Sequence, residues 1–268
     1  MRSKILYLLL ACQAVYAKPG INWQPPKHFH SLKPINFELA EFPGDSFLLI
    51  FPEWLTSREK SWHVRPVWKT DGTKATAMWN SAGISVGLTL AFHSNDCGHK
   101  LEWVYEVMNG SEDDLTDVAL FNCFNFVNAP TFRDLGMTRT WIRQGNRNTT
   151  QLSTVEKTQA SRTIQFYPAK GGILLTEFQR FMRYGATNTT ELAGDRIAVD
   201  SVDGKWTLES IVDGQVAYFF NNWEDTHGCI HAAPLLGNLP TGKSTISTGR
   251  LHFKKTHNRG ANSRSSSK

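Results

Sequence analysis

The chain has 268 residues, of which 40% are hydrophobic and 12% are aromatic, and its formal net charge is +5. The excess positive charge belongs to the two ends, because residues 18–256 alone have a formal net charge of zero. A protein that binds nucleic acid concentrates basic side chains on its folded surface, so the composition argues against a nucleic-acid partner. We expect a single domain over residues 18–256, followed by a disordered basic tail over 257–268.

The first 17 residues have the pattern of a secretory signal peptide. Arg2 and Lys4 precede a short apolar run over residues 5–11, and Val15–Ala17 supplies small residues for cleavage. A membrane anchor needs about 20 apolar residues, so this run is too short to span, and we expect no transmembrane segment elsewhere. The sequence therefore predicts a secreted or periplasmic protein. A lipoprotein box at Leu9–Cys12 is the alternative, and it would give a lipid-anchored envelope protein.

Apolar and polar residues alternate with a period of two along most of the remaining chain, which is typical of half-buried strands. The alternation is clearest over residues 84–93 and 101–108, and it recurs near 35–42, 115–126, 162–167, 205–212, 215–222 and 247–253. Turn signals separate these segments, including Asn109-Gly110 and Asp213-Gly214. Only residues 176–185 suggest a short helix. Many short strands joined by turns predict an all-β protein with a large antiparallel β-sandwich.

The stretch EWVYEVMNGSEDDLTDVALFN, within residues 84–126, resembles a pattern of large antiparallel sandwiches of the galactose-mutarotase-like kind. In that pattern a strand ends in an Asn-Gly turn, an acidic loop follows, and an apolar strand returns. The C-terminal stretch CIHAAPLLGNLPTGKSTISTGRLHF resembles uncharacterised exported bacterial proteins. The first resemblance implies a supersandwich fold and a sugar ligand on one sheet face. No motif places the catalytic His and Glu of mutarotases on this chain.

One face of the predicted hairpin 84–108 carries small or polar side chains. His93 lies on this face with serine, threonine and small residues, and the paired strand adds Glu102 and Glu106. A face packed against a second sheet would need large apolar residues instead. We therefore interpret it either as a solvated face or as the floor of a groove in which carboxylates and a histidine bind sugar hydroxyls.

The segment from Asp225 to Pro234 suggests a second site. Read as a strand, it points His227, Cys229 and His231 to one side, and Trp223 precedes it. Trp supplies a flat apolar face for a sugar ring. The predicted ligand-binding residues are therefore His93, Glu102, Glu106, Trp223 and His231. We expect no metal, and keep a zinc set of His99, His227 and His231 as a weaker alternative. The His93–His99 segment is expected to be a flexible loop.

Three cysteines remain after removal of the predicted signal peptide: Cys97, Cys123 and Cys229. One disulfide with one free thiol and three buried thiols are both consistent with the sequence, and we expect Cys229 to be buried near one of the others. The chain contains no phosphate-binding loop, nucleophile elbow or His-Glu-x-x-His motif, so no cofactor is predicted.

Two functional hypotheses follow. The first is an exported protein that binds carbohydrate or cell-envelope material without catalysis. The second is a carbohydrate-active enzyme, an epimerase, lyase or hydrolase, that uses His and Glu and a metal in one variant. The enzyme hypothesis requires His93 or His99 to share one pocket with His231 and a carboxylate. The sequence leaves open whether the protein is an enzyme.

Overall fold

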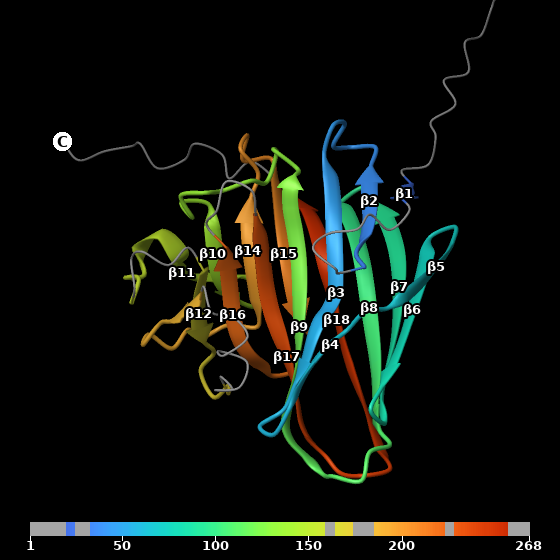
Figure 1. Cartoon of the computed structure of the whole chain (residues 1–268). Helices are drawn as coiled ribbons and strands as arrows, with labels where there is room; N and C mark the ends of the chain where they lie inside the picture. The colour runs from blue at the N-terminus through green and yellow to red at the C-terminus, as the bar shows by residue number, and fades with distance from the viewer. Residues whose placement is uncertain (1–19, 25–32, 159–163, 174–184, 223–227, 257–268) are drawn as a thin grey trace, which may run out of the picture.

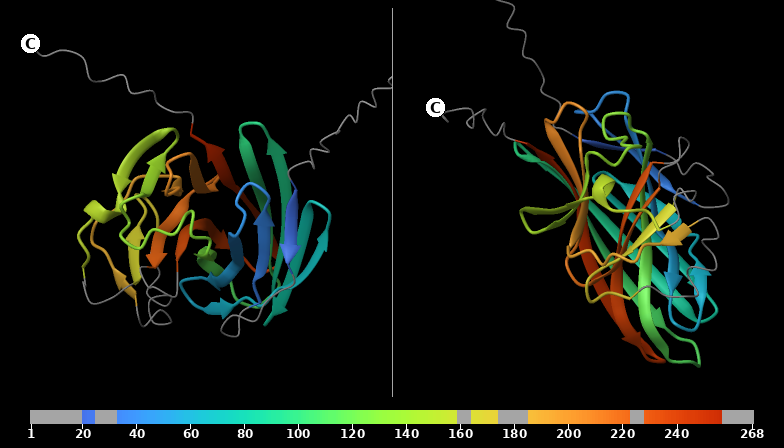
Figure 2. Two further views of the ribbon diagram at one scale, coloured as in Figure 1. Left: turned by 90° about the horizontal axis from the view of Figure 1, so that it is seen from above. Right: turned by 90° about the vertical axis from the view of Figure 1, so that its left-hand side faces the viewer.

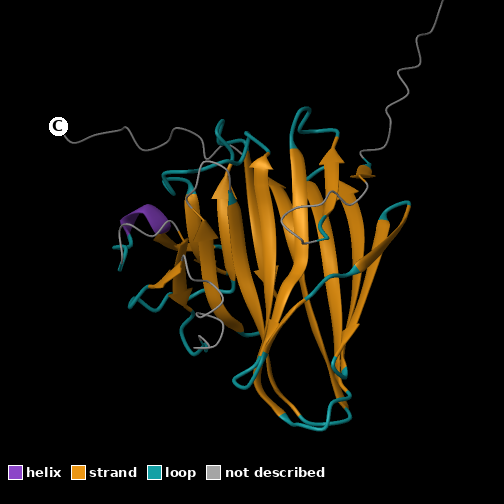
Figure 3. Ribbon diagram, viewed as in Figure 1, coloured by secondary structure: helices purple, strands orange, loops and turns teal. Residues whose placement is uncertain are grey.

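The computed structural model describes residues 20–24, 33–158, 164–173, 185–222 and 228–256. Several sequence predictions therefore fall outside the described residues: the signal peptide, the basic tail, most of the suggested helix at 176–185, Trp223 and His227. Within the described part, no helix is long and apolar enough to cross a membrane. Strands dominate, and one short 3-10 helix, η1 (Leu152–Thr154), stands beside them (Figure 3).

Two nine-stranded sheets make up the described chain. The first sheet has the spatial order β1 (Ile21–Gln24), β2 (Ile35–Leu39), β3 (Ser46–Thr56), β9 (Leu115–Asn128), β17 (Cys229–Leu239), β16 (Val216–Asn222), β12 (Ile164–Pro168) and β13 (Gly185–Thr187), and β4 (Ser61–His63) pairs with β3. The second has the order β11 (Arg147–Gln151), β10 (Thr140–Gln144), β14 (Arg196–Asp200), β15 (Trp206–Val212), β18 (Lys243–Lys255), β8 (Gly98–Asn109), β7 (Ile84–Asn95), β6 (Lys74–Ser81) and β5 (Val67–Asp71).

The sheets stack face to face (Figures 1 and 2). Among the paired strands described, only β12 and β13 run parallel, so the predicted antiparallel sandwich is confirmed. Strands β5 to β8 form a meander, in which Gly87 pairs with Glu106 and Ala91 with Glu102. The chain passes from one sheet to the other at several points, among them after β8, between β15 and β16, and between β17 and β18.

The main core fills the space between the sheets. Phe37, Phe47 and Phe124 of the first sheet pack on Phe253 of the second, with ring centroids 5.0–6.3 Å apart. A buried hydrogen bond also crosses the sandwich, because the Tyr105 hydroxyl donates to Asn122 Oδ1 at 2.7 Å. Alternation thus places one face of every long strand in this core.

The two outer faces differ in chemistry. On the first sheet, residues that alternate with the main core form a second buried apolar cluster, which includes Ile50, Phe121, Phe166 and Phe220. On the second sheet, the outer face is partly exposed and mixes polar side chains, among them Glu102 and Glu106, with apolar ones. The exposed apolar side chains of this face are Met78, Val104, Met108 and Ile246. The first sheet is therefore buried on both faces and the second on one.

Two expectations about the His93–His99 segment and the cysteines need correction. The segment is no flexible loop: β7 ends at Asn95 and β8 begins at Gly98, so His93 and His99 both lie in strands of a tight hairpin. The side chain of Asn95 accepts the backbone N–H of Cys97 and fixes that turn. Cys97 is exposed there, so the three cysteines are not all buried.

Candidate functional site

The outer face of the second sheet carries a transverse row of ionisable side chains. Strand register places Glu209, His252, Lys100 and His93 next to one another on β15, β18, β8 and β7. The next row contains Arg143 and Arg196 on β10 and β14, and Arg250 and Glu102 on β18 and β8. Because directly opposed residues share a face, the register alone gathers these groups on one surface.

A cavity of about 330 Å³ opens at one end of this row. We call it the polar basin, and define it by His93, Asn95, Cys97, Lys100, Glu102 and His252. His93 Nε2 lies 3.5 Å from Glu102 Oε2, and both side chains are more than half exposed. The basin thus offers to solvent a carboxylate acceptor, two imidazoles, an ammonium group and an amide from three adjacent strands.

Glu209 links the polar basin to a less exposed ionic network. Its carboxylate lies 3.7 Å from His252 Nδ1 and 3.5 Å from a guanidinium nitrogen of each of Arg143 and Arg196. Burial alone would raise the pKa of Glu209, but the hydrogen bond from His252 and the charges of the two arginines lower it below its ordinary value. The ionised carboxylate therefore holds the His252 ring at the edge of the polar basin.

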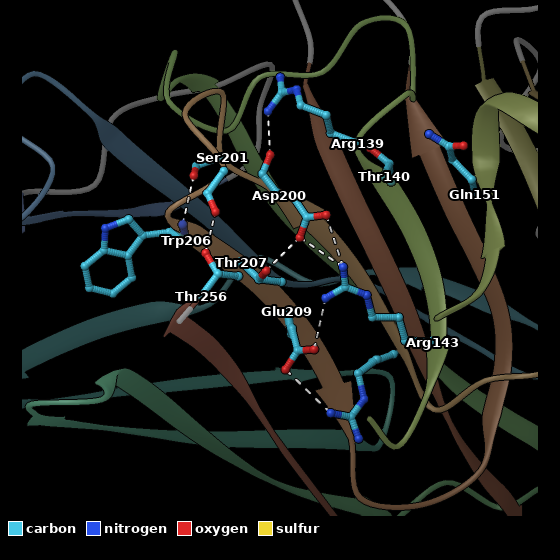
Figure 4. Close-up of polar contacts among 12 residues, drawn as sticks. Arg139, Thr140, Arg143, Gln151, Asp200, Ser201, Trp206, Thr207, Glu209 and Thr256 are labelled. Carbon is cyan, nitrogen blue, oxygen red and sulfur yellow. Dashed lines mark hydrogen bonds and ion pairs between the residues drawn. The ribbon is translucent and has the colours of Figure 1, made fainter. Parts of the chain in front are cut away.

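The carboxylate of Glu209 also offsets the repulsion between two arginines of neighbouring strands. Arg143 and Arg196 pair directly across β10 and β14, and like charges at such positions repel. Asp200 accepts from Arg143 at 2.9 and 3.2 Å, and Glu209 lies on the other side of the guanidinium (Figure 4). Asp195 accepts a two-point contact from Arg196 at 2.8 Å. Arg143 lies in strand β10, and its side chain is only 11% exposed.

The predicted site residues do not converge. His93 and Glu102 meet in the polar basin, while Glu106 lies on the same face four residues further along β8 and outside the basin. His231 lies on the far face of the first sheet, with the main core between it and His93. The single pocket required by the enzyme hypothesis for His93 and His231 is therefore not formed.

His99 also lies apart from His231. Its ring stacks between Phe92 and Trp206, Nε2 lies 3.2 Å from Glu41, and Nδ1 lies 2.9 Å from the Ser94 hydroxyl. Burial lowers the pKa of His99 from its ordinary value, against the charge of Glu41. These contacts give His99 a structural place in the hairpin.

His231 itself is 1% exposed and lies between two aromatic rings. Phe121 stacks on it at 4.2 Å, and the edge of Phe220 approaches at 4.3 Å between centroids. Burial lowers the pKa of His231 well below its ordinary value, so the imidazole is neutral. The ligand atoms of Cys123, Cys229 and His231 all lie within 4.8 Å of one another. The expected proximity of Cys229 to another cysteine is thus confirmed, with both thiols free.

Sequence reasoning missed His252, Lys100 and Glu209. The signal was present, because each alternates with core residues of its strand in the same way as His93 and Glu102. What the sequence lacked was the pairing of β18 with β8, which brings His252 beside Lys100 across a separation of 152 residues.

No protein-family model matches this chain, and no curated protein matches it in sequence. Solved structures do resemble it. A galactose mutarotase-like protein from Clostridium acetobutylicum is 11% identical, with a TM-score of 0.43 over 88% of this chain and 99% of the other. A protein of Escherichia coli K12 provisionally described as an aldose 1-epimerase is 10% identical, with a TM-score of 0.43 over 88% and 100%. The resemblance expected from residues 84–126 is confirmed as a weak likeness of fold, and no residue role is taken from it.

Proposed function

We propose that the protein is exported and binds a carbohydrate of the cell envelope or its surroundings in the polar basin. One observation carries the proposal: His93, Lys100, Glu102 and His252 converge from three strands in one cavity. A carboxylate accepts hydrogen bonds from hydroxyls, whereas Lys and protonated ring nitrogens donate them. Such a set of paired donors and acceptors suits a ligand that is rich in hydroxyl groups.

The ionic network behind the polar basin supports a preorganised site. Contact of Glu209 with Nδ1 of His252 leaves Nε2 as the ring nitrogen for a ligand. Because Glu209 is only 8% exposed and is tied to two arginines, the ring is held before the ligand arrives. Preorganisation of this kind reduces the entropic cost of binding. The predicted ligand roles of Trp223 and His231 are not part of this proposal, because Trp223 lies outside the described residues and His231 is buried on the other sheet.

The test compares two glutamates of one strand. The protein is screened against neutral and acidic polysaccharides, peptidoglycan fragments and lipopolysaccharide core oligosaccharides, and the Kd of the best ligand is measured by calorimetry. Glu102→Gln is expected to weaken binding about tenfold or more, since a hydrogen bond to a charged group is worth about 1.5–3 kcal/mol. Glu106→Gln, on the same face but outside the basin, should leave Kd unchanged. Equal effects of the two variants, or no binding at all, would contradict the proposal.

One contact favours the enzyme alternative, because His93 and Glu102 are close enough to exchange a proton through a bound substrate. Once a glycan ligand is found, release of reducing ends, formation of unsaturated products and epimerisation are followed by sugar NMR. Turnover that His93→Gln and Glu102→Gln abolish would establish catalysis. Binding without turnover would leave the non-catalytic function.

A further inference from the structure

The second outer face holds three metal-binding side chains that the proposed function does not use. Cys229 pairs with Asn125 and Ile230 with Phe124, so the same register sets His231 opposite Cys123. Side chains two residues apart on a strand share a face. The neighbouring strands β9 and β17 therefore present Cys123, Cys229 and His231 together, and their donor atoms lie within 4.8 Å of one another.

The three side chains are buried, and the imidazole lacks the polar contacts that a bound ion would supply. Cys123 and Cys229 are each 4% exposed and His231 is 1% exposed. Among the described residues, neither ring nitrogen of His231 has a hydrogen bond of good geometry, and only the backbone of Asn122 acts on the ring as a hydrogen-bond partner. The amide nitrogen of Asn125 beside Cys229 lacks a partner as well. A buried polar group without a partner destabilises the folded state. An electron-pair acceptor placed among the three side chains would remove this cost for the imidazole.

We propose that Cys123, Cys229 and His231 bind a thiophilic metal ion, Zn²⁺ or Cu⁺. Two sulfurs and one imidazole nitrogen are the donor set that these ions prefer. Zinc–sulfur bonds of about 2.3 Å at a tetrahedral angle separate two sulfurs by about 3.8 Å. The observed upper limit of 4.8 Å therefore requires movements of about 1 Å, which side-chain rotation supplies.

The three side chains leave one coordination position open for a tetrahedral Zn²⁺ ion. A water molecule can take a fourth position of this kind. Cu⁺ needs no fourth donor, because the two sulfurs and the nitrogen satisfy it.

The proton balance gives a distinct signature. Both thiols must lose a proton to bind, so Zn²⁺ plus two thiols and a neutral imidazole gives the bound ion and two released protons. Burial raises the pKa of Cys123 well above its ordinary value, and the metal must offset this. The apparent affinity for Zn²⁺ should therefore rise about 100-fold for each unit of pH around neutrality.

The test uses the full-length protein, reduced and stripped of metal with a chelator. Co²⁺ is titrated as a spectroscopic probe, because thiolate-to-cobalt charge-transfer bands report sulfur ligation directly. Zn²⁺ and Cu⁺ are then added in separate competition experiments, and metal content is measured by elemental analysis. We expect one equivalent of Co²⁺ with thiolate bands, displaced by Zn²⁺ or by Cu⁺. The concentration at which each ion displaces Co²⁺ ranks the affinities of the site for Zn²⁺ and Cu⁺.

Variants assign the ligands. Cys123→Ser, Cys229→Ser and His231→Gln should each weaken Zn²⁺ binding at least about 100-fold. Cys97→Ser is the matched control, because Cys97 is an exposed thiol on the other sheet, and its binding should equal that of the wild type. Near-ultraviolet circular dichroism verifies that each variant folds. Proton release on Zn²⁺ binding is measured with the wild type alone, so it tests the proposal even where a variant fails to fold.

Two results would overturn the proposal. The first is no Co²⁺ binding by the reduced wild type, whether or not the purified protein contains a Cys123–Cys229 disulfide before reduction. The second is Co²⁺ binding without thiolate bands, or with bands that persist in both Cys123→Ser and Cys229→Ser.

Discussion

Glu53 shows how one side chain can oppose the stability of its own fold. Burial raises the pKa of its carboxyl from 4.5 to about 7, although a hydrogen bond from Trp54 opposes the shift. Between these two pH values the folded protein holds a proton that the unfolded chain has released. The free energy of unfolding therefore falls as pH rises through this window, and the loss is complete above about pH 7.

Glu53→Gln should remove that loss, since an amide does not ionise. In metal-free protein at pH 8, we expect the variant to be more stable than the wild type by about 1–2 kcal/mol. At pH 4 the two proteins should have equal stability within error. Urea unfolding at both pH values provides the measurement, and Glu106→Gln is an exposed control that should track the wild type. A constant difference between Glu53→Gln and wild type across pH would show that the carboxyl titrates normally.

At the scale of single residues, the sequence identified some candidate site residues but not the residues of other strands that lie beside them. His93 and Glu102 were found because they alternate with core residues within one hairpin, where pairing follows from a short turn. Cys123 and His231 belong to strands that are more than 100 residues apart, and their meeting depends on how β9 pairs with β17. Local periodicity reports which way a side chain points, and it contains no information about which distant strand lies beside it.

At the scale of strands and turns, the turn signals predicted where strands end but not which sheet the chain enters next. Asn109-Gly110 and Asp213-Gly214 do end strands, yet both carry the chain to the other sheet instead of closing a hairpin. By contrast, Asp96 and Cys97 close a hairpin of the meander with a loop of two residues, although the sequence there suggested a flexible loop. Whether a turn stays in its sheet is decided by packing of the strands that follow it.

Strand β18 depends on a glycine at its most crowded point. Gly249 lies between Trp103 of β8 and Val212 of β15, and a Cβ there would lie 2.1 Å from the Trp103 ring and 2.2 Å from the Ile211 carbonyl oxygen. Because one of these neighbours is backbone, it cannot rotate away. We expect Gly249→Ala to lower the free energy of unfolding by about 3 kcal/mol.

Gly214→Ala is the matched control for that experiment, since a Cβ at Gly214 meets no atom within 4 Å. Its stability should change by no more than about 0.5 kcal/mol. Denaturant unfolding of the two variants and the wild type provides the comparison. If both glycine variants have the same stability, then β15, β18 and β8 are less tightly packed than the structure shows.

For the whole molecule, one aromatic cluster decides whether the sandwich unfolds as a unit. Phe253 belongs to the second sheet, but it packs on Phe37, Phe47 and Phe124 of the first, and Phe42 and Phe132 close the cluster. Removing a buried Phe side chain costs about 3–5 kcal/mol. Since the lost contacts belong to both sheets, Phe253→Ala should lower the stability of both equally.

Amide hydrogen exchange under native conditions measures this directly. In Phe253→Ala, exchange of the most protected amides of β9 in the first sheet and of β8 in the second should accelerate by the same factor, about 100-fold or more. Ile246→Ala lies on the same strand with a side chain that is 67% exposed on the outer face, and it should leave both rates almost unchanged. Faster exchange in β8 alone would mean that the two sheets unfold independently. In that case the polar basin and the cysteine–histidine cluster, which lie on opposite sheets, would belong to separate cooperative units.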